Sequence, residues 1–333
     1  MLSVFVSAVL FLTACGESIR YSFTLEGPIM GTFYHIKVID PDKRLDQEKL
    51  KQDVTQRLTY LNQQFSTYFD DSGLMQFNAA PVNEAVPLSA ELFHVLLQSL
   101  EVSWLSNGAF DVTVGPLVEL WGFGRRESGD MLPSDKLIDN TLSTVGFQFL
   151  ELDIARQTGL KKRPIQIDLS AIAKGYAVDQ IYALLASYQA EDYMVEIGGE
   201  IRVSSRNAHN TPWRIAIEEP VDGLSMVHRA ISISNMAVAT SGDYRNYFEK
   251  EGVRYSHTIS PVSGRPITHH LASVTVIHEE ASMADAFATA IDVMGPEQGF
   301  VFANQQQIAA YMLVKSENGF EARYSDAFKP YIK

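Results

Sequence analysis

Residues 165–179 read IQIDLSAIAKGYAVD, and the hydrophobic period changes within this stretch. Apolar and polar residues alternate from Ile165 to Leu169, which predicts a short strand. From Ala171 onward the apolar residues follow helical spacing, and Ser170 is placed to cap the amino terminus of that helix. The stretch therefore predicts a strand that runs through a polar turn into a helix.

The amino terminus of this predicted helix is a candidate anion site. Its free backbone N–H groups and its positive dipole end suit a phosphate-bearing ligand. Lys174 can reach an anion, and Gly175 lets a ligand or another backbone approach closely. A glycine inside a helix costs about 1 kcal/mol relative to alanine, so a compensating contact is expected. The alternative is an ordinary strand–helix unit with Lys174 in solvent.

Length and charge limit the classes of function. With 333 residues the chain can form one large domain or two lobes with a substantial core. Its 46% hydrophobic and 20% charged residues are typical of a soluble globular protein. The net charge of -13 argues against a broad basic surface, so no nucleic-acid partner is expected. A local basic pocket for one nucleotide remains compatible with this charge.

The amino terminus differs from the rest of the chain. Residues 2–12 are almost wholly apolar, but the run is too short to span a bilayer and has the length of a signal-peptide core. It ends in Leu-Thr-Ala-Cys, residues 12–15, which resembles a bacterial lipobox. We therefore expect a signal peptide over residues 1–14, lipid on Cys15 and a linker over residues 15–27. The alternative is a conventional signal sequence with an incidental cysteine.

Cys15 is the only cysteine in the chain. If it carries lipid, the folded part has no thiol for a disulfide, a thiolate metal site or a catalytic nucleophile. The expected location is the periplasmic side of a bacterial membrane, with a lipid anchor in place of a spanning helix.

Periodicity and turn residues predict the other elements. Helices are expected at 44–65, 90–105, from Ser134, after 171 and at 282–294. Strands are expected at 32–39, 193–204, 213–218, 228–240 and 273–278, with hairpins at 244–259 and 308–324. Helices concentrate in the first half and strands in the second. This order favours an α+β fold of mixed sheets with packed helices, in two intimately associated lobes.

The predicted helix from Ser282 carries Asp285 and Thr289 four residues apart, and therefore on one face. A carboxylate and a hydroxyl together suit Mg²⁺, which prefers hard oxygen ligands. The alternative is a capping box, in which Ser282 and Asp285 stabilise the start of their own helix. Asp292 continues the same face and is interpreted as solvated.

His257 is the histidine with hydroxyl and charged neighbours on both sides, within YSHTISPVSGRPI at residues 255–267. A histidine of near-neutral pKa is a natural general base for a hydroxyl, although a structural role is the alternative. His269 and His270 lie close in sequence. Gly198-Gly199 lacks the spacing of a dinucleotide fingerprint, and no Walker, Gly-x-Ser-x-Gly or HExxH motif occurs.

Together these segments resemble the ApbE family, the FAD:protein FMN transferases of bacterial envelopes. The blocks that carry the resemblance follow the family's order and cover nearly everything after residue 28. They are Met30-Gly31-Thr32, FSTY at 65–68, FDVTVGP at 110–116, IDLSAIAKGYAVD at 167–179, EIGGE at 196–200, ATSGDYRNYF at 239–248, YSHTI at 255–259, Gly264-Arg265-Pro266, ADA at 284–286 and ATA at 288–290. The resemblance implies an ApbE-like domain over residues 28–333.

The resemblance also implies an activity and its residues. FMN is transferred from FAD, which is a substrate, to a threonine or serine hydroxyl of an acceptor protein, and AMP is released. It implies Mg²⁺ held by the carbonyl of Ala171 and the side chains of Asp285 and Thr289, and it favours metal over capping there. His257 is the expected base. The implied FAD contacts are Met30, Tyr68, Ala109, Phe110, Asp111, Asp168, Lys174, His257, Thr258 and Ile259.

The expected acceptor is a membrane subunit of a sodium-pumping or electron-transfer complex, with a sequence of the type Asp-Gly-x-Ser/Thr-x-Ala-Thr. Two rival functions stay open. Water could replace the acceptor hydroxyl, which would make the chain an FAD pyrophosphatase that yields FMN and AMP. Alternatively, the chain could be a flavin-binding lipoprotein without turnover.

Overall fold

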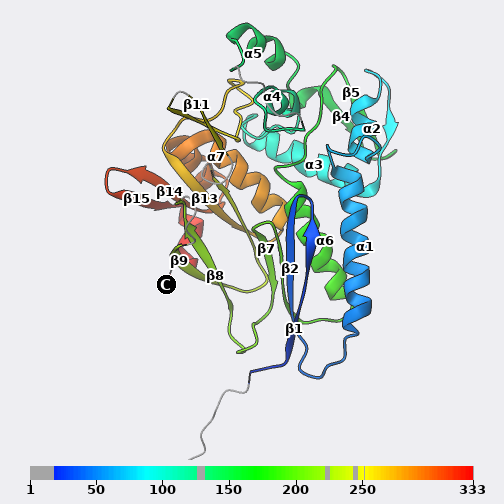
Figure 1. The fold of residues 1–333 in the computed structure, drawn as a ribbon, viewed down its shortest axis with the longest axis vertical. Helices are drawn as coiled ribbons and strands as arrows, with labels where there is room; N and C mark the ends of the chain where they lie inside the picture. Colours follow the sequence, from blue (N-terminus) through cyan, green and yellow to red (C-terminus); the bar gives the residue numbers. More distant parts are fainter. Residues whose placement is uncertain (1–18, 126–131, 222–225, 243–246, 251, 333) are drawn as a thin grey trace, which may run out of the picture.

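The computed structural model describes residues 19–125, 132–221, 226–242, 247–250 and 252–332 (Figure 1). The expected signal peptide, Cys15 and the first part of the expected linker lie outside the described residues. So do residues 243–246 and 251 of the hairpin expected at 244–259.

One eight-stranded sheet forms the centre of the fold, in the order β1-β2-β6-β7-β10-β13-β14-β15. Neighbouring strands pair antiparallel throughout this sheet. β1 begins inside the stretch expected to be a linker, so the sheet begins earlier than the sequence indicated. The strands are β1 (Ser22–Ile29), β2 (Thr32–Ile39), β6 (Asp192–Ile197), β7 (Glu200–Ser204), β10 (Ala237–Gly242), β13 (Leu271–His278), β14 (Ala309–Ser316) and β15 (Gly319–Tyr324).

The sheet is covered on both faces, as the side chains of β14 demonstrate. Ala310 and Met312 belong to the largest hydrophobic cluster, whereas Tyr311 and Leu313 belong to a second cluster. Successive side chains of a strand point to opposite faces, so the two clusters lie on opposite sides of the sheet. The strand is therefore almost continuously apolar.

Helices cover one face of the sheet (Figure 1). Asp46 caps α1 and Ser89 caps α3, each by accepting a backbone N–H of the first turn. The predicted helix at 90–105 is confirmed with the same bounds. The elements on this side are α1 (Gln47–Phe65), α2 (Gly73–Ala79), α3 (Ala90–Leu105), α6 (Ala173–Ser187), α7 (Ala281–Gln305) and a small sheet of β3 (Val86–Pro87), β4 (Leu150–Asp153) and β5 (Thr158–Lys161).

The opposite face of the sheet packs against a two-stranded sheet and a closing 3-10 helix. These are β8 (Trp213–Glu219), β9 (Met226–Ile233) and η2 (Asp326–Tyr331). A third, smaller cluster of Leu117, Trp121, Ile138 and Ile259 lies apart from the sheet. It is built by α4 (Gly115–Leu120), α5 (Asp135–Leu142) and the end of a hairpin of β11 (Tyr247–Lys250) and β12 (Val253–Ser256). A short η1 (Phe147–Phe149) precedes β4.

The expected strand at 165–169 is not part of a sheet. Ile165, Ile167 and Leu169 are buried as the alternation predicts, but Gln166 forms only an isolated parallel bridge to Val114. The side chain of Asn78 replaces a neighbouring strand. Its Oδ1 accepts the N–H of Ile167 at 2.7 Å and its Nδ2 donates to the carbonyl of Ile167 at 2.9 Å. The periodicity was therefore right about burial and wrong about pairing.

The stretch expected as one strand at 228–240 is two strands, β9 and β10, which belong to different sheets. Asn235, between them, has a positive φ of 54°, a left-handed conformation that interrupts the extended chain. None of the helices within the described ranges has the length and apolarity needed to cross a bilayer.

The first helical segment of α7 ends at a kink, which the side chain of His269 stabilises. Gly295 has φ 76° and ψ -177°, and Pro296 follows it. Proline has no N–H, so the carbonyl of Asp292 loses its helical donor. His269 supplies one, because its Nε2 lies 2.6 Å from that carbonyl oxygen. The Nδ1 of His269 accepts the N–H of Leu271, which indicates a neutral ring and a structural role.

We expect Gly295→Ala to lower the free energy of unfolding by about 3 kcal/mol, because this backbone conformation is nearly restricted to glycine and the core tolerates little added volume. A Cβ there would lie 2.7 Å from the ring of His269. Urea unfolding measures the change. Gly252→Ala is the matched control, since Gly252 has the same φ of 76° but no atom within 4 Å of the added Cβ. A smaller loss in Gly295→Ala than in the control would contradict the assignment.

Candidate functional site

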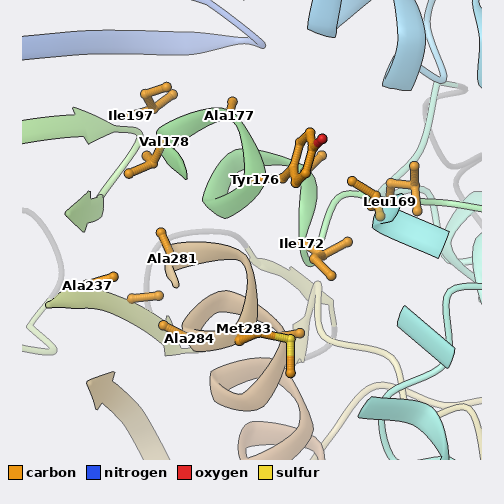
Figure 2. Close-up of a cluster of buried hydrophobic side chains, with 14 of the residues drawn as sticks. Leu169, Ile172, Tyr176, Ala177, Val178, Ile197, Ala237, Ala281, Met283 and Ala284 are labelled. Atoms are coloured by element: carbon orange, nitrogen blue, oxygen red, sulfur yellow. The ribbon is translucent and has the colours of Figure 1, made fainter. Parts of the chain in front are cut away.

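The site forms where the amino-terminal turns of α6 and α7 cross at very short distance (Figure 2). A Cβ on Gly175 would lie 2.3 Å from the carbonyl oxygen of Ala281, so only glycine permits the contact. Ala177 and Val178 of α6 and Ala284 of α7 are fully buried beside the crossing. The backbone of α7 at Ala281 therefore makes the close approach that was expected at Gly175. This contact explains why α6 contains a glycine at position 175.

The helix α6 begins later than expected and is not capped by Ser170. Its cap residue is Ile172, which makes no side-chain capping bond. Ser170 instead donates through its backbone N–H and its hydroxyl to Oδ1 of Asp168. Asp168 thus closes the turn before the helix. The N–H of Ala173 at the start of α6 donates to the carbonyl of Leu169 at 2.8 Å, so the helix offers an anion mainly its positive dipole end.

Asp285 does not cap its own helix, so the capping-box interpretation is wrong. Asp179 of α6 caps α7 instead, because its two carboxylate oxygens accept the N–H groups of Ala281 and Ser282, each at 2.9 Å. Arg202 of β7 donates to Asp179 at 2.6 Å and fixes the carboxylate. Asp285 is 6% exposed and its Oδ2 accepts the N–H of Gly175 at 3.2 Å. Its carboxylate therefore points across the crossing towards α6.

Lys174 lies between two buried carboxylates. Its Nζ is 2.7 Å from Oε1 of Glu200 and 3.9 Å from Oδ2 of Asp285. Burial favours the neutral amine, but the two carboxylates outweigh it and hold the pKa of Lys174 above its ordinary value. Burial raises the pKa of the Asp285 carboxyl and raises the pKa of Glu200 to about 7, against the opposing effect of Lys174. Two carboxyls facing one ammonium give the site an excess of negative charge.

Glu200 is a site residue that the sequence did not single out. It is 4% exposed, and its Oε2 is buried without a hydrogen-bond partner. Glu200 is the first residue of β7, directly after the Gly198-Gly199 turn that joins β6 to β7. Its position in the EIGGE block was the available signal. Only the pairing of β6 with β7 shows that this carboxylate faces Lys174.

The expected metal ligands fit a hard divalent cation. Asp285 and Thr289 lie one turn apart on α7, and Thr289 and Ala171 are half-exposed. The Gly175 N–H and Lys174 both contact Oδ2 of Asp285, which leaves Oδ1 available to a ligand. The excess negative charge favours a cation here. Within the described ranges no three His, Cys, Asp or Glu side chains form a metal cluster. The expected ligand set of Ala171, Asp285 and Thr289 contains only one such side chain, the carboxylate of Asp285. A shared ion between Ala171 and Asp285 stays a prediction.

The turn that contains Met30 lies beside Lys174. Met30 and Gly31 connect β1 to β2, and Met30 has a positive φ of 48°. A Cβ on Gly198 would lie 2.9 Å from the side chain of Thr32 and 3.3 Å from that of Lys174. The two side chains therefore meet at Gly198.

The segment 109–115 lies against Asp168. The N–H of Asp168 donates to the carbonyl of Val112 at 2.7 Å. Phe110 is 2% exposed and belongs to the main core. Burial raises the pKa of Asp111, whose carboxylate accepts bonds from Thr113 and from the N–H of Phe147. Asp111 thus stabilises the turn itself. Ala109 is also buried, so these three residues offer a ligand mainly their backbone.

Tyr68 differs from the other expected FAD contacts because it is exposed. Its side chain is 63% accessible, on the loop after α1, and neighbouring Phe69 is 44% accessible. Within the described part of the chain, the Tyr68 N–H donates to the hydroxyl of neighbouring Ser66, and the role of Tyr68 as a flavin contact stays a prediction.

His257 follows directly after β12 and is half-exposed, with its ring centroid 6.4 Å from that of Phe123. Thr258 and Ile259 are buried, and Ile259 packs in the small third cluster.

The interpretation of Asp292 as solvated is wrong. Asp292 is 0% exposed, and its Oδ2 accepts hydrogen bonds from Ser241 at 3.0 Å and Thr258 at 3.2 Å. Helical spacing predicted the helix face on which Asp292 lies. It could not predict which elements cover that face.

Fold and candidate site together define a class: an α+β protein in which a lysine lies between two buried carboxyls at the crossing of two helix amino termini. The comparisons with known proteins identify it further. Residues 30–312 match the model of the ApbE family, and this chain belongs to that family.

The relatives and solved structures agree with this assignment. A Vibrio cholerae protein named FAD:protein FMN transferase is 42% identical, over 99% of this chain and 98% of its own length. A Haemophilus influenzae protein of the same name is 39% identical, over 97% of this chain and 95% of its own length. The solved flavin transferase ApbE from Vibrio cholerae superposes with a TM-score of 0.87 at 41% identity, covering 94% of this chain and 99% of that structure. The predicted family and fold are confirmed.

We expect Gly175→Ala to lower the free energy of unfolding by about 2 kcal/mol or more, because the added methyl forces α6 and α7 apart. Helix propensity alone predicts the opposite sign, a gain of about 1 kcal/mol. Thermal and urea unfolding therefore distinguish the two expectations by the sign of the change in the free energy of unfolding. A stabilised Gly175→Ala variant would show that the crossing is not as tight as the structure describes.

Proposed function

We propose that this chain is a magnesium-dependent FAD:protein FMN transferase, which moves FMN from FAD to a threonine or serine hydroxyl of an acceptor protein and releases AMP. The observation that carries the proposal is the arrangement of Lys174 and Asp285 at the uncapped start of α6. Membership of the ApbE family and the names of the relatives support it.

The chain's own donors suit the metal. Asp285, Thr289 and the carbonyl of Ala171 would hold Mg²⁺, which supplies positive charge to the pyrophosphate of FAD when bound. The excess negative charge of the Asp285–Lys174–Glu200 group favours that cation.

The residues around the crossing bind and orient the pyrophosphate. Lys174 offers an ammonium, which its partners keep protonated. Glu200 holds this ammonium at 2.7 Å and so limits its position. The positive dipole end at the start of α6 adds its partial positive charge. These groups stabilise the charge that develops on phosphate oxygens during transfer, which is the main way that proteins catalyse such reactions.

The chemistry is a displacement at phosphorus. The acceptor hydroxyl oxygen forms a bond to the phosphorus of the FMN half, and the phosphoanhydride bond to the AMP half breaks. His257 takes the hydroxyl proton, and AMP leaves with the electron pair of the broken bond. The half-exposed position of His257 at the end of β12 allows an external hydroxyl to reach it.

The proposal includes the setting of the reaction. The acceptor is a membrane subunit of a sodium-pumping or electron-transfer complex. The lipobox-like residues 12–15 support a lipid anchor on Cys15 and a location on the periplasmic side of a bacterial membrane. A lipid anchor would keep the enzyme close to such an acceptor.

One incubation tests the proposal against its rivals. The protein is mixed with FAD, Mg²⁺ and an acceptor that carries the Asp-Gly-x-Ser/Thr-x-Ala-Thr type sequence, and the products are analysed by mass spectrometry. An FMN adduct on the acceptor hydroxyl is expected. Free FMN and AMP without an adduct would indicate an FAD pyrophosphatase, and unchanged FAD would indicate a flavin-binding protein without turnover.

Asp285→Ala is expected to reduce FMN transfer by about 100-fold or more, since removing one group that stabilises transition-state charge has effects of this order. Chelation by EDTA should abolish transfer by the unmodified protein, and added Mg²⁺ should restore it. Neither treatment should change the residual rate of the variant. Asp139→Ala removes an exposed carboxylate from α5 and serves as the control. Full magnesium-dependent turnover by Asp285→Ala would refute the metal assignment.

His257→Ala is expected to reduce the transfer rate by about 10²- to 10⁴-fold, the usual contribution of a general base. Because His257 is also an expected FAD contact, FAD binding is measured separately by flavin fluorescence, and the rate is compared at saturating FAD. His270→Ala is the matched control, because His270 is a nearby exposed histidine. If His257→Ala transferred FMN at the normal rate from about pH 6 to 9, a range that brackets the ordinary pKa of histidine, another group or solvent must take the proton.

A further inference from the structure

Asp292 is a fully buried carboxylate that neither the metal site nor the FAD contacts account for. Burying a carboxylate is costly unless hydrogen bonds compensate. Its Oδ2 accepts the hydroxyl of Ser241 from β10 and the hydroxyl of Thr258 from the segment after β12. Asp292 thus joins three elements at one atom: α7, the central sheet and the chain segment that carries His257.

The position of Asp292 on α7 is equally specific. Asp285, Thr289 and Asp292 are separated by four and three residues, so they occupy one face of the helix. A straight helix rises 1.5 Å per residue, which places Asp292 about 10 Å along the axis from Asp285. The kink at Gly295 lies beyond all three residues, so this part of α7 is one rigid rod.

The segment after β12 is held by hydrogen bonds that converge on Thr258. Its backbone N–H donates to the hydroxyl of Ser256 at 3.1 Å, and its carbonyl accepts the N–H of Ile267 at 3.1 Å. Its hydroxyl then fixes the segment to α7 through Asp292. Because His257 directly precedes Thr258, the direction in which the imidazole leaves the backbone depends on this attachment.

We propose that Asp292 is a positioning residue, which acts through Thr258 to hold His257 at a set place relative to Asp285 and Thr289. The inference rests on the proposed function, since it gives a role to the base of that reaction. The face of α7 then serves two purposes. Its second and third turns carry the expected metal ligands, and its fourth turn fixes the base, so one helix sets the distance between them.

The variants are chosen to separate this attachment from general stability. Asp292→Leu and Thr258→Val each remove the hydrogen bond with little change of volume, and Thr258→Ser keeps the hydroxyl. Misplacement of a catalytic group by about 1 Å can cost about 100-fold, so we expect kcat for FMN transfer to fall about 10- to 100-fold in the first two variants. The KM for FAD should change less than about threefold in Asp292→Leu, since Asp292 is not an expected FAD contact. Thr258→Ser should lose less of its kcat than Thr258→Val. Ser241→Ala, which removes the other donor to Asp292, is the control and should lose little.

A double-mutant cycle provides the decisive kinetic measurement. If Asp292 acts through His257, adding Asp292→Leu to His257→Ala should reduce the remaining rate by less than about twofold. An equal loss in both backgrounds would show a merely structural role and overturn the inference. So would a normal rate in Asp292→Leu or in His257→Ala alone.

A measurement that does not depend on turnover separates this inference from the proposed function. Backbone amide exchange, followed by mass spectrometry, should increase over residues 253–260 in Asp292→Leu and stay unchanged over α3. Unchanged exchange over residues 253–260 would overturn the inference even if the enzyme transfers FMN. Increased exchange in a protein that forms no adduct would refute the proposed function and leave the attachment of this segment to Asp292 established.

Discussion

The contact between Gly175 of α6 and Ala281 of α7 is the constraint on which the site depends. Any larger residue at 175 would collide with the carbonyl of Ala281, at 2.3 Å from the first added atom. The contact brings the starts of two helices together, with their positive dipole ends. Without compensation the two ends would repel each other. Asp179 and Asp285 supply that compensation, since each crosses from one helix to accept N–H groups of the other.

Side chains from distant parts of the chain replace missing backbone partners at three places around this contact. Asp179 caps α7, Asn78 supplies the hydrogen bonds that a strand would give to Ile167, and His269 donates to the carbonyl left free by Pro296. An unpaired buried backbone group costs roughly as much as a lost hydrogen bond. Each replacement therefore allows an irregular backbone segment close to the site, where Asp168, Lys174 and the residues of the first turn of α6 must remain accessible.

The site itself was predicted in part, and the misses have one cause. Asp285, Thr289 and Lys174 were recognisable because helical spacing and a family resemblance place chemistry-bearing residues at fixed intervals. Glu200 and Asp292 were missed or misread, although both lie within a few residues of recognised motifs. Their importance comes from what packs over them: Glu200 faces Lys174 because β6 pairs with β7, and Asp292 is buried because β10 and the segment after β12 cover α7. A local sequence pattern predicts the face of a helix or strand on which a residue lies, but it does not predict which element packs against that face.

The sequence by itself determined the class of fold, most helix bounds, the burial of Ile165, Ile167 and Leu169, and the family to which the chain belongs. These features depend on local periodicity, capping residues and short motifs, which are properties of neighbouring residues. Only the tertiary structure decided that Asp179 and not Asp285 caps α7, that Asn78 replaces a strand, and that Asp292 is fully buried. Each of these depends on hydrogen bonds between residues that are 34 to 103 positions apart in sequence, and such a bond exists only once the helices and the sheet have packed.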